Sequence, residues 1–245
     1  METDITKYSE DFKIRANEVD NDGKATLPAI FSLFQEVAGN HALKLNFDIT
    51  QLQEQDLTWV LHRMDVNIDR FPNWREEITI ETWPAAGDAL RAFRDYRILD
   101  KSGETLGVCL SYWMMINIKT RRPARMPEEV LNMRLKDIDH VLDPKATRLK
   151  PFQDMDESYS FDVRNSDLDM NDHVNNARYV EWIMEHHSDT DSSPINVIDI
   201  QFLRESVAGD SITSDVIKTD EHTYLHQLKN QNGEVLVLAE CKQNS

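Results

Sequence analysis

One pattern of segments occurs twice along the 245-residue chain, and this repeat restricts the folds that the sequence can adopt. Residues 15–36 (RANEVDNDGKATLPAIFSLFQE) and residues 164–185 (RNSDLDMNDHVNNARYVEWIME) each run from an arginine through an acidic turn into an amphipathic segment. Apolar residues recur at helical spacing from Leu27 to Ala38 and from Val174 to Met184. Each half is therefore predicted to hold one helix with a buried face.

Strand-like segments separated by turn residues follow both predicted helices. Gly103 and Gly233 lie where tight hairpins are expected. Because a sheet that wraps around one helix buries it on most sides, the sequence predicts an α+β fold of two tandem antiparallel sheets, each wrapped around a central helix. The expected strands span residues 58–69, 77–85, 91–99 and 104–118 in the first half, and about 195–204, 211–219, 222–229 and 234–241 in the second. The expected domains are residues 1–135 and 156–245, joined by a polar linker with two prolines, residues 136–155.

Composition and charge narrow the classes of function. A formal net charge of −17 argues against DNA or RNA as a general partner, because phosphate backbones are bound by clustered Lys and Arg. No run of about 18 apolar residues is present, so no membrane-spanning helix is expected. The acidic, polar start METDITKYSED lacks the features of a secretory signal or a transit peptide. The two cysteines, Cys109 and Cys241, indicate neither a disulfide framework nor a metal site. A reducing cytoplasm is therefore the expected compartment. No cofactor is expected.

A short basic segment interrupts this acidic background. Residues 119–125, KTRRPAR, carry four cations and no acid. One interpretation is a solvated basic loop, and the other is a docking patch for an acidic partner, since a local positive field steers association despite an unfavourable net charge. The charge by itself leaves both open. The four cations are Lys119, Arg121, Arg122 and Arg125.

Reactive side chains are most concentrated in residues 167–179, DLDMNDHVNNARY. Asp169, Asn171 and His173 alternate there just before the second predicted helix, and in an extended or turning segment this spacing points three side chains the same way. The helix start offers unpaired N–H groups that suit a developing oxyanion, and histidine moves protons near neutral pH. The competing interpretation is that these residues only cap the helix and form the turn. A metal site is not indicated, because no His-x-x-x-His pair accompanies the adjacent His186 and His187.

Several long segments resemble the acyl-ACP thioesterases, the plant chain-terminating enzymes and their bacterial relatives. This resemblance covers nearly the whole chain and implies two fused hotdog domains that release a free fatty acid from acyl carrier protein. It places Asp169, Asn171 and His173 on the family's catalytic positions, and Glu205 on the downstream acid from the strand after the helix. The segments are LTWVLHRMDVNIDRFPNW (57–74), ETW (81–83), FRDYRILDKSGETL (93–106), SYWMMINIKTRRPARMPEEV (111–130), DLDMNDHVNNARYVEWIME (167–185) and FLRES (202–206).

One residue departs from the family pattern. Plant members commonly have cysteine after the glutamate, for which a papain-like scheme was once proposed, whereas this chain has Ser206. A serine attacks only when a base removes its proton, so direct hydrolysis by water is the simpler hypothesis. Under that hypothesis Glu205 and His173 activate the water and move its proton, and Asn171 positions the water or the oxyanion. Asp169 either orients its neighbours or shares the base role.

The first half is then free to hold the acyl chain. Trp59, Met64 and Met114 are expected to line a tunnel there, and the alternative is ordinary core packing. Acyl carrier proteins are small and acidic, so Arg121, Arg122 and Arg125 are expected to face that partner. Rival functions are an acyl-CoA thioesterase, a hotdog dehydratase and a non-catalytic acyl-binding protein on the same scaffold. Both a monomer and a homodimer are compatible with the sequence.

Overall fold

The structure, a computed structural model, describes residues 6–85, 87, 90–132, 138–187 and 194–243. The chain forms two compact units, residues 1–144 and residues 145–245. The expected boundary between the first domain and the linker, at residues 135 and 136, lies outside the described residues. No helix in the described ranges combines the length and the apolar character needed to cross a bilayer.

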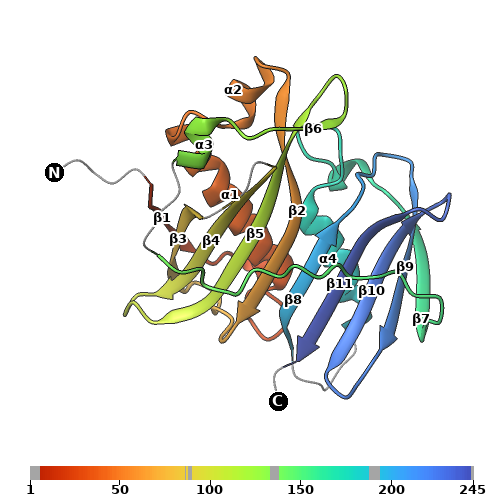
Figure 1. Cartoon of the computed structure of the whole chain (residues 1–245). Coiled ribbons are helices and arrows are strands. Elements are labelled where there is room, and N and C mark those ends of the chain that lie inside the picture. The colour runs from red at the N-terminus through yellow and green to blue at the C-terminus, as the bar shows by residue number, and fades with distance from the viewer. Residues whose placement is uncertain (1–5, 86, 88–89, 133–137, 188–193, 244–245) are drawn as a thin grey trace. The chain divides into compact units, whose positions relative to one another are not determined.

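In the first unit, one long helix lies across an antiparallel sheet (Figure 1). The helix α1 (Leu27–Lys44) begins where the Thr26 side chain accepts a hydrogen bond from the Ala29 N–H, and its buried face packs on the sheet. It extends six residues beyond the predicted end at Ala38 because its last turn, which includes the buried His41, also packs inward. The strand order is β1-β3-β4-β5-β2, with β6 paired to β5. The strands are β1 (Tyr8–Lys13), β2 (Leu57–Ile68), β3 (Glu77–Ala85), β4 (Arg91–Asp100), β5 (Thr105–Asn117) and β6 (Arg122–Ala124).

Two short helices and β6 were not predicted from the sequence. The helices α2 (Ile49–Gln53) and α3 (Glu128–Asn132) have five residues each, too few for a periodic apolar pattern to stand out. Leu52, Met115 and Met126 form a small core that joins both helices to the ends of β2 and β5. Residues 119–124 of the basic segment lie in the hairpin formed by β5 and β6, in which Asn117 pairs with Arg122.

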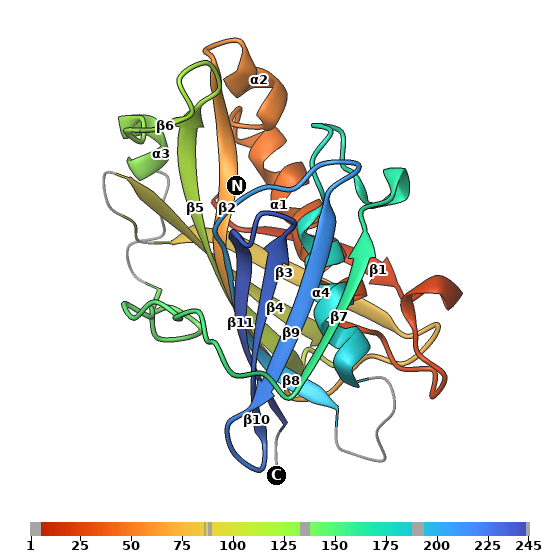
Figure 2. The same cartoon turned by 90° about the vertical axis from the view of Figure 1, so that its right-hand side faces the viewer.

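In the second unit, a shorter helix lies against the antiparallel strands of that unit (Figure 2). The helix α4 (Asn176–Met184) is capped by Asn175, whose side chain accepts the Ala177 N–H at 2.9 Å. The Trp182 ring packs edge-on against Phe161 of the outermost strand at 4.9 Å. The order is β8-β11-β10-β9-β7. The strands are β7 (Glu157–Asp162), β8 (Ile195–Phe202), β9 (Ser211–Lys218), β10 (Thr223–Asn230) and β11 (Val235–Gln243).

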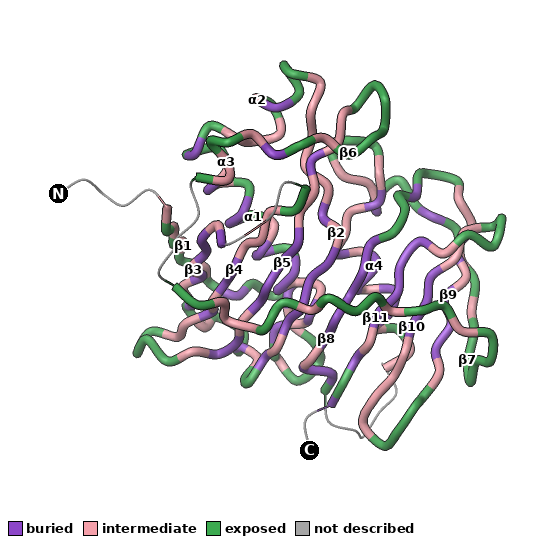
Figure 3. The backbone as a smooth tube through the Cα atoms, in the orientation of Figure 1, coloured by how far each residue is buried: buried purple, intermediate pink, exposed green. Residues whose placement is uncertain are grey.

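Burial confirms the fold class predicted from the repeat. Buried residues are concentrated in the middles of the strands and on the helices that face them, while the turns are exposed (Figure 3). Gly103 and Gly233 both adopt a positive φ, 85° and 75°, in the β4–β5 and β10–β11 hairpins where turns were expected. Each unit is thus an antiparallel sheet around one central helix, the arrangement called a hotdog.

Candidate active site

The segment Asp169–His173 forms a tight turn that is held by one carboxylate. The Asp169 side chain accepts hydrogen bonds from the backbone N–H groups of Asn171, at 2.7 Å, and of His173, at 3.4 Å. The Asp169 N–H donates to the His173 carbonyl at 2.7 Å, and Asp172 adopts a left-handed conformation with φ 60°. The three side chains therefore do not all point the same way, as an extended segment would require. The Asp169 side chain folds back on the backbone, and His173 lies at the end of the turn.

Glu205 faces His173 from the loop after β8, and not from the strand itself as was expected, because β8 ends at Phe202. The distance between His173 Nε2 and Glu205 Oε2 is 3.5 Å, and both side chains are about one-third exposed, 31% and 35%. The loop is tied to the turn because the Val174 N–H donates to the Ser206 carbonyl at 2.9 Å. An imidazole and a carboxylate from distant parts of the sequence thus face each other at an accessible position, with Asn171 exposed on the same turn.

The first unit contains the same turn with different side chains. Asp20 accepts the backbone N–H groups of Asp22 and Lys24, each at 2.9 Å, as Asp169 does for Asn171 and His173. The Asp20 N–H donates to the Lys24 carbonyl at 2.9 Å, and Gly23 has the positive φ, 74°, that Asp172 has in the second unit. The common part of the two turns is therefore the anchoring aspartate and the backbone.

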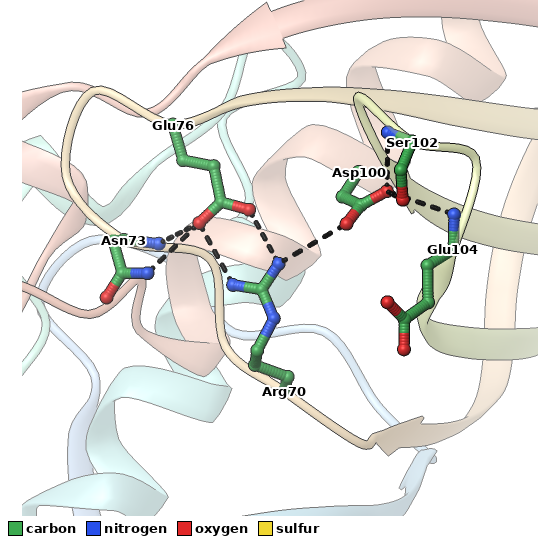
Figure 4. A network of polar contacts seen from close by, with 6 residues as sticks. All are labelled: Arg70, Asn73, Glu76, Asp100, Ser102 and Glu104. Carbon is green, nitrogen blue, oxygen red and sulfur yellow. Dashed lines mark hydrogen bonds and ion pairs between the residues drawn. The ribbon is translucent and has the colours of Figure 1, made fainter.

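The loop that carries Glu205 also has a counterpart, shown in Figure 4. In the first unit, Glu76 closes the loop after β2 by accepting hydrogen bonds from Arg70, at 3.0 and 2.7 Å, and from the Asn73 backbone at 2.9 Å. The hydrogen bonds from Arg70 are the main reason that the pKa of Glu76 is lowered to about 2. The Ala25 N–H donates to the Pro72 carbonyl at 2.8 Å, just as Val174 does to Ser206.

In the second unit, Asp210 occupies the position equivalent to Glu76. Its carboxylate accepts the Ser206 hydroxyl at 2.7 Å and the Val207 N–H at 3.0 Å. Asp210 was not predicted from the sequence. A signal for it exists, because each half has an acid six positions after an arginine: Glu76 after Arg70, and Asp210 after Arg204. Asp210 therefore holds the loop.

Comparison of the two units shows which residues hold the turn and the loop in both, and which side chains occur only in the second unit. The scaffold is shared, but where the second unit has His173 and Glu205 the first has Lys24 and Phe71. A lysine and a phenylalanine cannot form the imidazole–carboxylate pair. The groups that distinguish the second unit are thus Asn171, His173 and Glu205, whereas Asp169 keeps its role in both.

Ser206 does not have the geometry of a nucleophile. It is 1% exposed, and its hydroxyl donates to Asp210. The start of α4 is also occupied, because the Ala177 and Arg178 N–H groups already donate to Asn175, at 2.9 Å each. These two amides therefore do not serve as free oxyanion donors.

The structure brings two of the three expected tunnel residues to one face of the first sheet. Met64 lies opposite Ser111, and Ser111 lies opposite Arg94, whose guanidinium contacts His41 of α1 at 2.9 Å. Trp59 shares this helix-facing side because a bulge between Leu61 and Arg63 shifts the alternation of β2 by one residue.

Met114 is not brought together with these two residues. It pairs with Val60, whereas its neighbour Met115 pairs with Trp59. Successive side chains of a strand point to opposite faces, so Met114 lies on the side away from α1.

The expected docking arginines lie together on the β5–β6 hairpin. Arg121, Arg122 and Arg125 are exposed. Lys119, on the same hairpin, forms an ion pair with Asp56 at 2.6 Å. Within the described ranges, no group of three or more His, Cys, Asp or Glu side chains is arranged to hold a metal ion.

The helix-centred arrangement of each unit defines the class of protein, a double hotdog protein. Two domain families match this chain. They are "Acyl-ACP thioesterase N-terminal domain" over residues 5–133 and "Acyl-ACP thioesterase C-terminal domain" over residues 152–244. The chain belongs to the acyl-ACP thioesterase family, as the resemblance in the sequence indicated.

Individual relatives agree with this assignment. A chloroplastic palmitoyl-acyl carrier protein thioesterase of Arabidopsis thaliana is 32% identical over 210 residues, which cover 80% of this chain and 50% of that protein. The chain thus spans half the length of this curated relative. The crystal structure of an acyl-ACP thioesterase from Bacteroides thetaiotaomicron has 25% identity and a TM-score of 0.88, covering 98% of each chain. The 12:0-ACP thioesterase from Umbellularia californica has 27% identity and a TM-score of 0.87, covering 98% of this chain and 97% of that one.

Proposed function

We propose that this chain hydrolyses the thioester of fatty acyl-[acyl carrier protein], releases the free fatty acid and so ends chain elongation. The observation that carries the proposal is the 3.5 Å approach of His173 Nε2 to Glu205 Oε2, with Asn171 exposed on the same turn. Membership of the family and the names of the relatives support the thioester as the bond that is cut.

The chemistry needs one water and a proton shuttle. The water oxygen attacks the thioester carbonyl carbon while its proton passes to the Glu205–His173 pair. The carbonyl oxygen becomes an oxyanion, for which the Asn171 side chain is the proposed donor. The carbon–sulfur bond then breaks, and the phosphopantetheine sulfur leaves as a thiolate and takes the proton back. A thiol with a pKa of about 8.5 leaves readily, so no strong leaving-group acid is required.

In this scheme Asp169 is a positioning residue. Its carboxylate is engaged by two backbone N–H groups, and Asp20 makes the same pair of bonds in a unit that lacks His173 and Glu205. The shared scaffold supports assigning the proton transfer to Glu205 and His173. The buried, Asp210-bound hydroxyl of Ser206 supports attack by water over attack by serine.

The first unit is proposed to hold the acyl chain. Its helix-facing side carries Trp59 and Met64, and both are apolar enough to line a hydrocarbon pocket. Arg121, Arg122 and Arg125 are proposed to meet the acidic carrier protein, because three exposed guanidiniums on one hairpin provide a local positive field on a chain of net charge −17. The buried, unpaired cysteines, Cys109 and Cys241, support a reducing compartment, and we propose the cytoplasm.

Hydrolysis of acyl-ACPs and acyl-CoAs of matched chain length tests the substrate class. We expect acyl-ACP to be the better substrate by kcat/KM. Preference for acyl-CoA would replace the proposal by its nearest rival, and no hydrolysis of either would favour an acyl-binding protein.

Charge reversal tests the docking surface. The variant Arg121→Glu/Arg122→Glu/Arg125→Glu should raise the KM for acyl-ACP about tenfold and spare a small synthetic thioester, with an effect that shrinks at high salt. Lys101→Glu, on the β4–β5 hairpin of the same unit, is the matched control. Equal loss on both substrates would show that the arginines support the fold and do not bind the carrier.

A further inference from the structure

We propose that Tyr179 is a positioning residue of the active site, whose hydroxyl holds the Glu205–Ser206 segment so that Glu205 meets His173. The inference rests on the proposed function and deepens it. Tyr179 lies on the first turns of α4, is 2% exposed, and is remote from Glu205 in the sequence.

The Tyr179 hydroxyl is a buried polar group on a ring that packs against other aromatic rings. Its ring packs edge-on against Trp182 at 5.2 Å and against Phe202 at 6.0 Å. Within the described part of the chain, no group meets hydrogen-bond geometry with the hydroxyl oxygen. A buried hydroxyl without a full hydrogen bond costs stability, so its presence requires a reason beyond packing.

The surroundings of the hydroxyl point to the loop after β8. Burial raises the pKa of Tyr179 well above its ordinary value, and the nearby backbone N–H of Ser206 opposes this rise. Among the carboxylates that raise the pKa further, Glu205 has the largest effect. The hydroxyl therefore stays protonated at neutral pH and lies beside the peptide that joins Glu205 to Ser206.

The first unit serves as an internal control. The helix caps Thr26 and Asn175 correspond, so the position of Tyr179 corresponds to Ile30 of α1. Ile30 is fully buried, which shows that an apolar side chain fills this position well. The hydroxyl occurs only in the unit whose loop carries Glu205, since the first unit has Phe71 there. The hydroxyl therefore occurs with the proposed catalytic residues, and the fold alone does not require it.

The backbone of Ser206 would then be held from two sides. Its carbonyl accepts the Val174 N–H at 2.9 Å, which fixes it to the catalytic turn. Its N–H lies near the Tyr179 hydroxyl without meeting hydrogen-bond geometry, and the proposed contact would hold it to α4. Because Glu205 directly precedes Ser206, removal of the hydroxyl should let its carboxylate drift from His173. Displacements of this kind, of about 1 Å, lower turnover by up to about 100-fold.

The test is the kinetics of Tyr179→Phe on acyl-ACP in the wild-type and Glu205→Gln backgrounds. Tyr159→Phe is the matched control, because Tyr159 also places a hydroxyl in the second unit but donates it to the Trp182 carbonyl. We expect Tyr179→Phe to lower kcat at least about tenfold with KM within about twofold. It should have no further effect once Glu205 is Gln, since a residue that acts through Glu205 cannot act without it.

Other outcomes overturn the inference. A Tyr179→Phe enzyme with wild-type kcat shows that the hydroxyl is not used. An equal loss in the Glu205→Gln background shows that it acts independently of Glu205. A thermal midpoint that falls more than that of Tyr159→Phe shows a structural role. Failure of the wild-type chain to hydrolyse acyl-ACP would instead refute the proposed function, and the inference with it.

Discussion

The two equivalent turns allow the role of Asp169 to be measured against an internal standard. Asp169→Ala removes the acceptor of two backbone hydrogen bonds, and Asp20→Ala removes the same two in the first unit. Replacement of a capping side chain by Ala typically costs about 0.5–2 kcal/mol. For a chain of this size each kcal/mol lowers the thermal midpoint by about 2–4 °C. Both variants should therefore lose a few degrees.

The kinetics of the two variants should differ sharply. Asp169→Ala should lower kcat about 100-fold, because the turn that aims Asn171 and His173 loosens, whereas Asp20→Ala should leave kcat within about twofold. Asp169→Asn keeps the accepting oxygen and should retain at least about a tenth of kcat. Steady-state hydrolysis of acyl-ACP with thermal unfolding of each variant provides the data. An Asp169→Asn enzyme as inactive as Asp169→Ala would refute this reasoning and show that the carboxylate takes part in proton transfer.

Two further predictions concern Ser206 and the pair formed by His187 and His226. Ser206→Ala should keep kcat on acyl-ACP within about threefold while losing about 1 kcal/mol of stability with its hydrogen bond to Asp210; an inactive but folded variant would contradict direct attack by water. His187 Nε2 lies 3.0 Å from His226 Nε2, and burial, aided by the charge of His186, lowers the pKa of His187 to about 4 from 6.5. The stabilising effect of neutral His187 is complete above about pH 6.5 and is lost as the pH falls toward 4, so roughly 2 kcal/mol of unfolding free energy should disappear between pH 7 and pH 5. Denaturant unfolding of His187→Gln should show a pH dependence smaller by that amount, and an unchanged dependence would contradict the assigned cause.

The sequence predicted the fold because each half satisfies the same physical demands. The turn, the amphipathic helix and the alternating strands all indicated one helix per sheet, and the structure confirms them. The extra length of α1 and the short α2 and α3 could not be predicted, because they are stabilised by a local core around Leu52, Met115 and Met126 and not by their own periodicity.

The candidate site was only partly predictable. The spacing of Asp169, Asn171 and His173 located the turn, but one of these residues folds back on the backbone, which only the hydrogen bonds reveal. The bulge in β2 brings Trp59 to the same face as Met64, and no local signal in the sequence places a bulge there. Tyr179 was missed because a tyrosine on an amphipathic helix looks like ordinary core until its hydroxyl is found without a full partner.

The central claim is that His173 and Glu205 act together on one water. Its most direct test is single-turnover hydrolysis of acyl-ACP by His173→Ala, by Glu205→Gln and by the double variant. We predict that each single change lowers the rate at least about 100-fold and that the double variant is no slower than the worse single one, because the two groups work as a unit. A folded Glu205→Gln enzyme with the wild-type rate, or rate losses that multiply in the double variant, would contradict the claim.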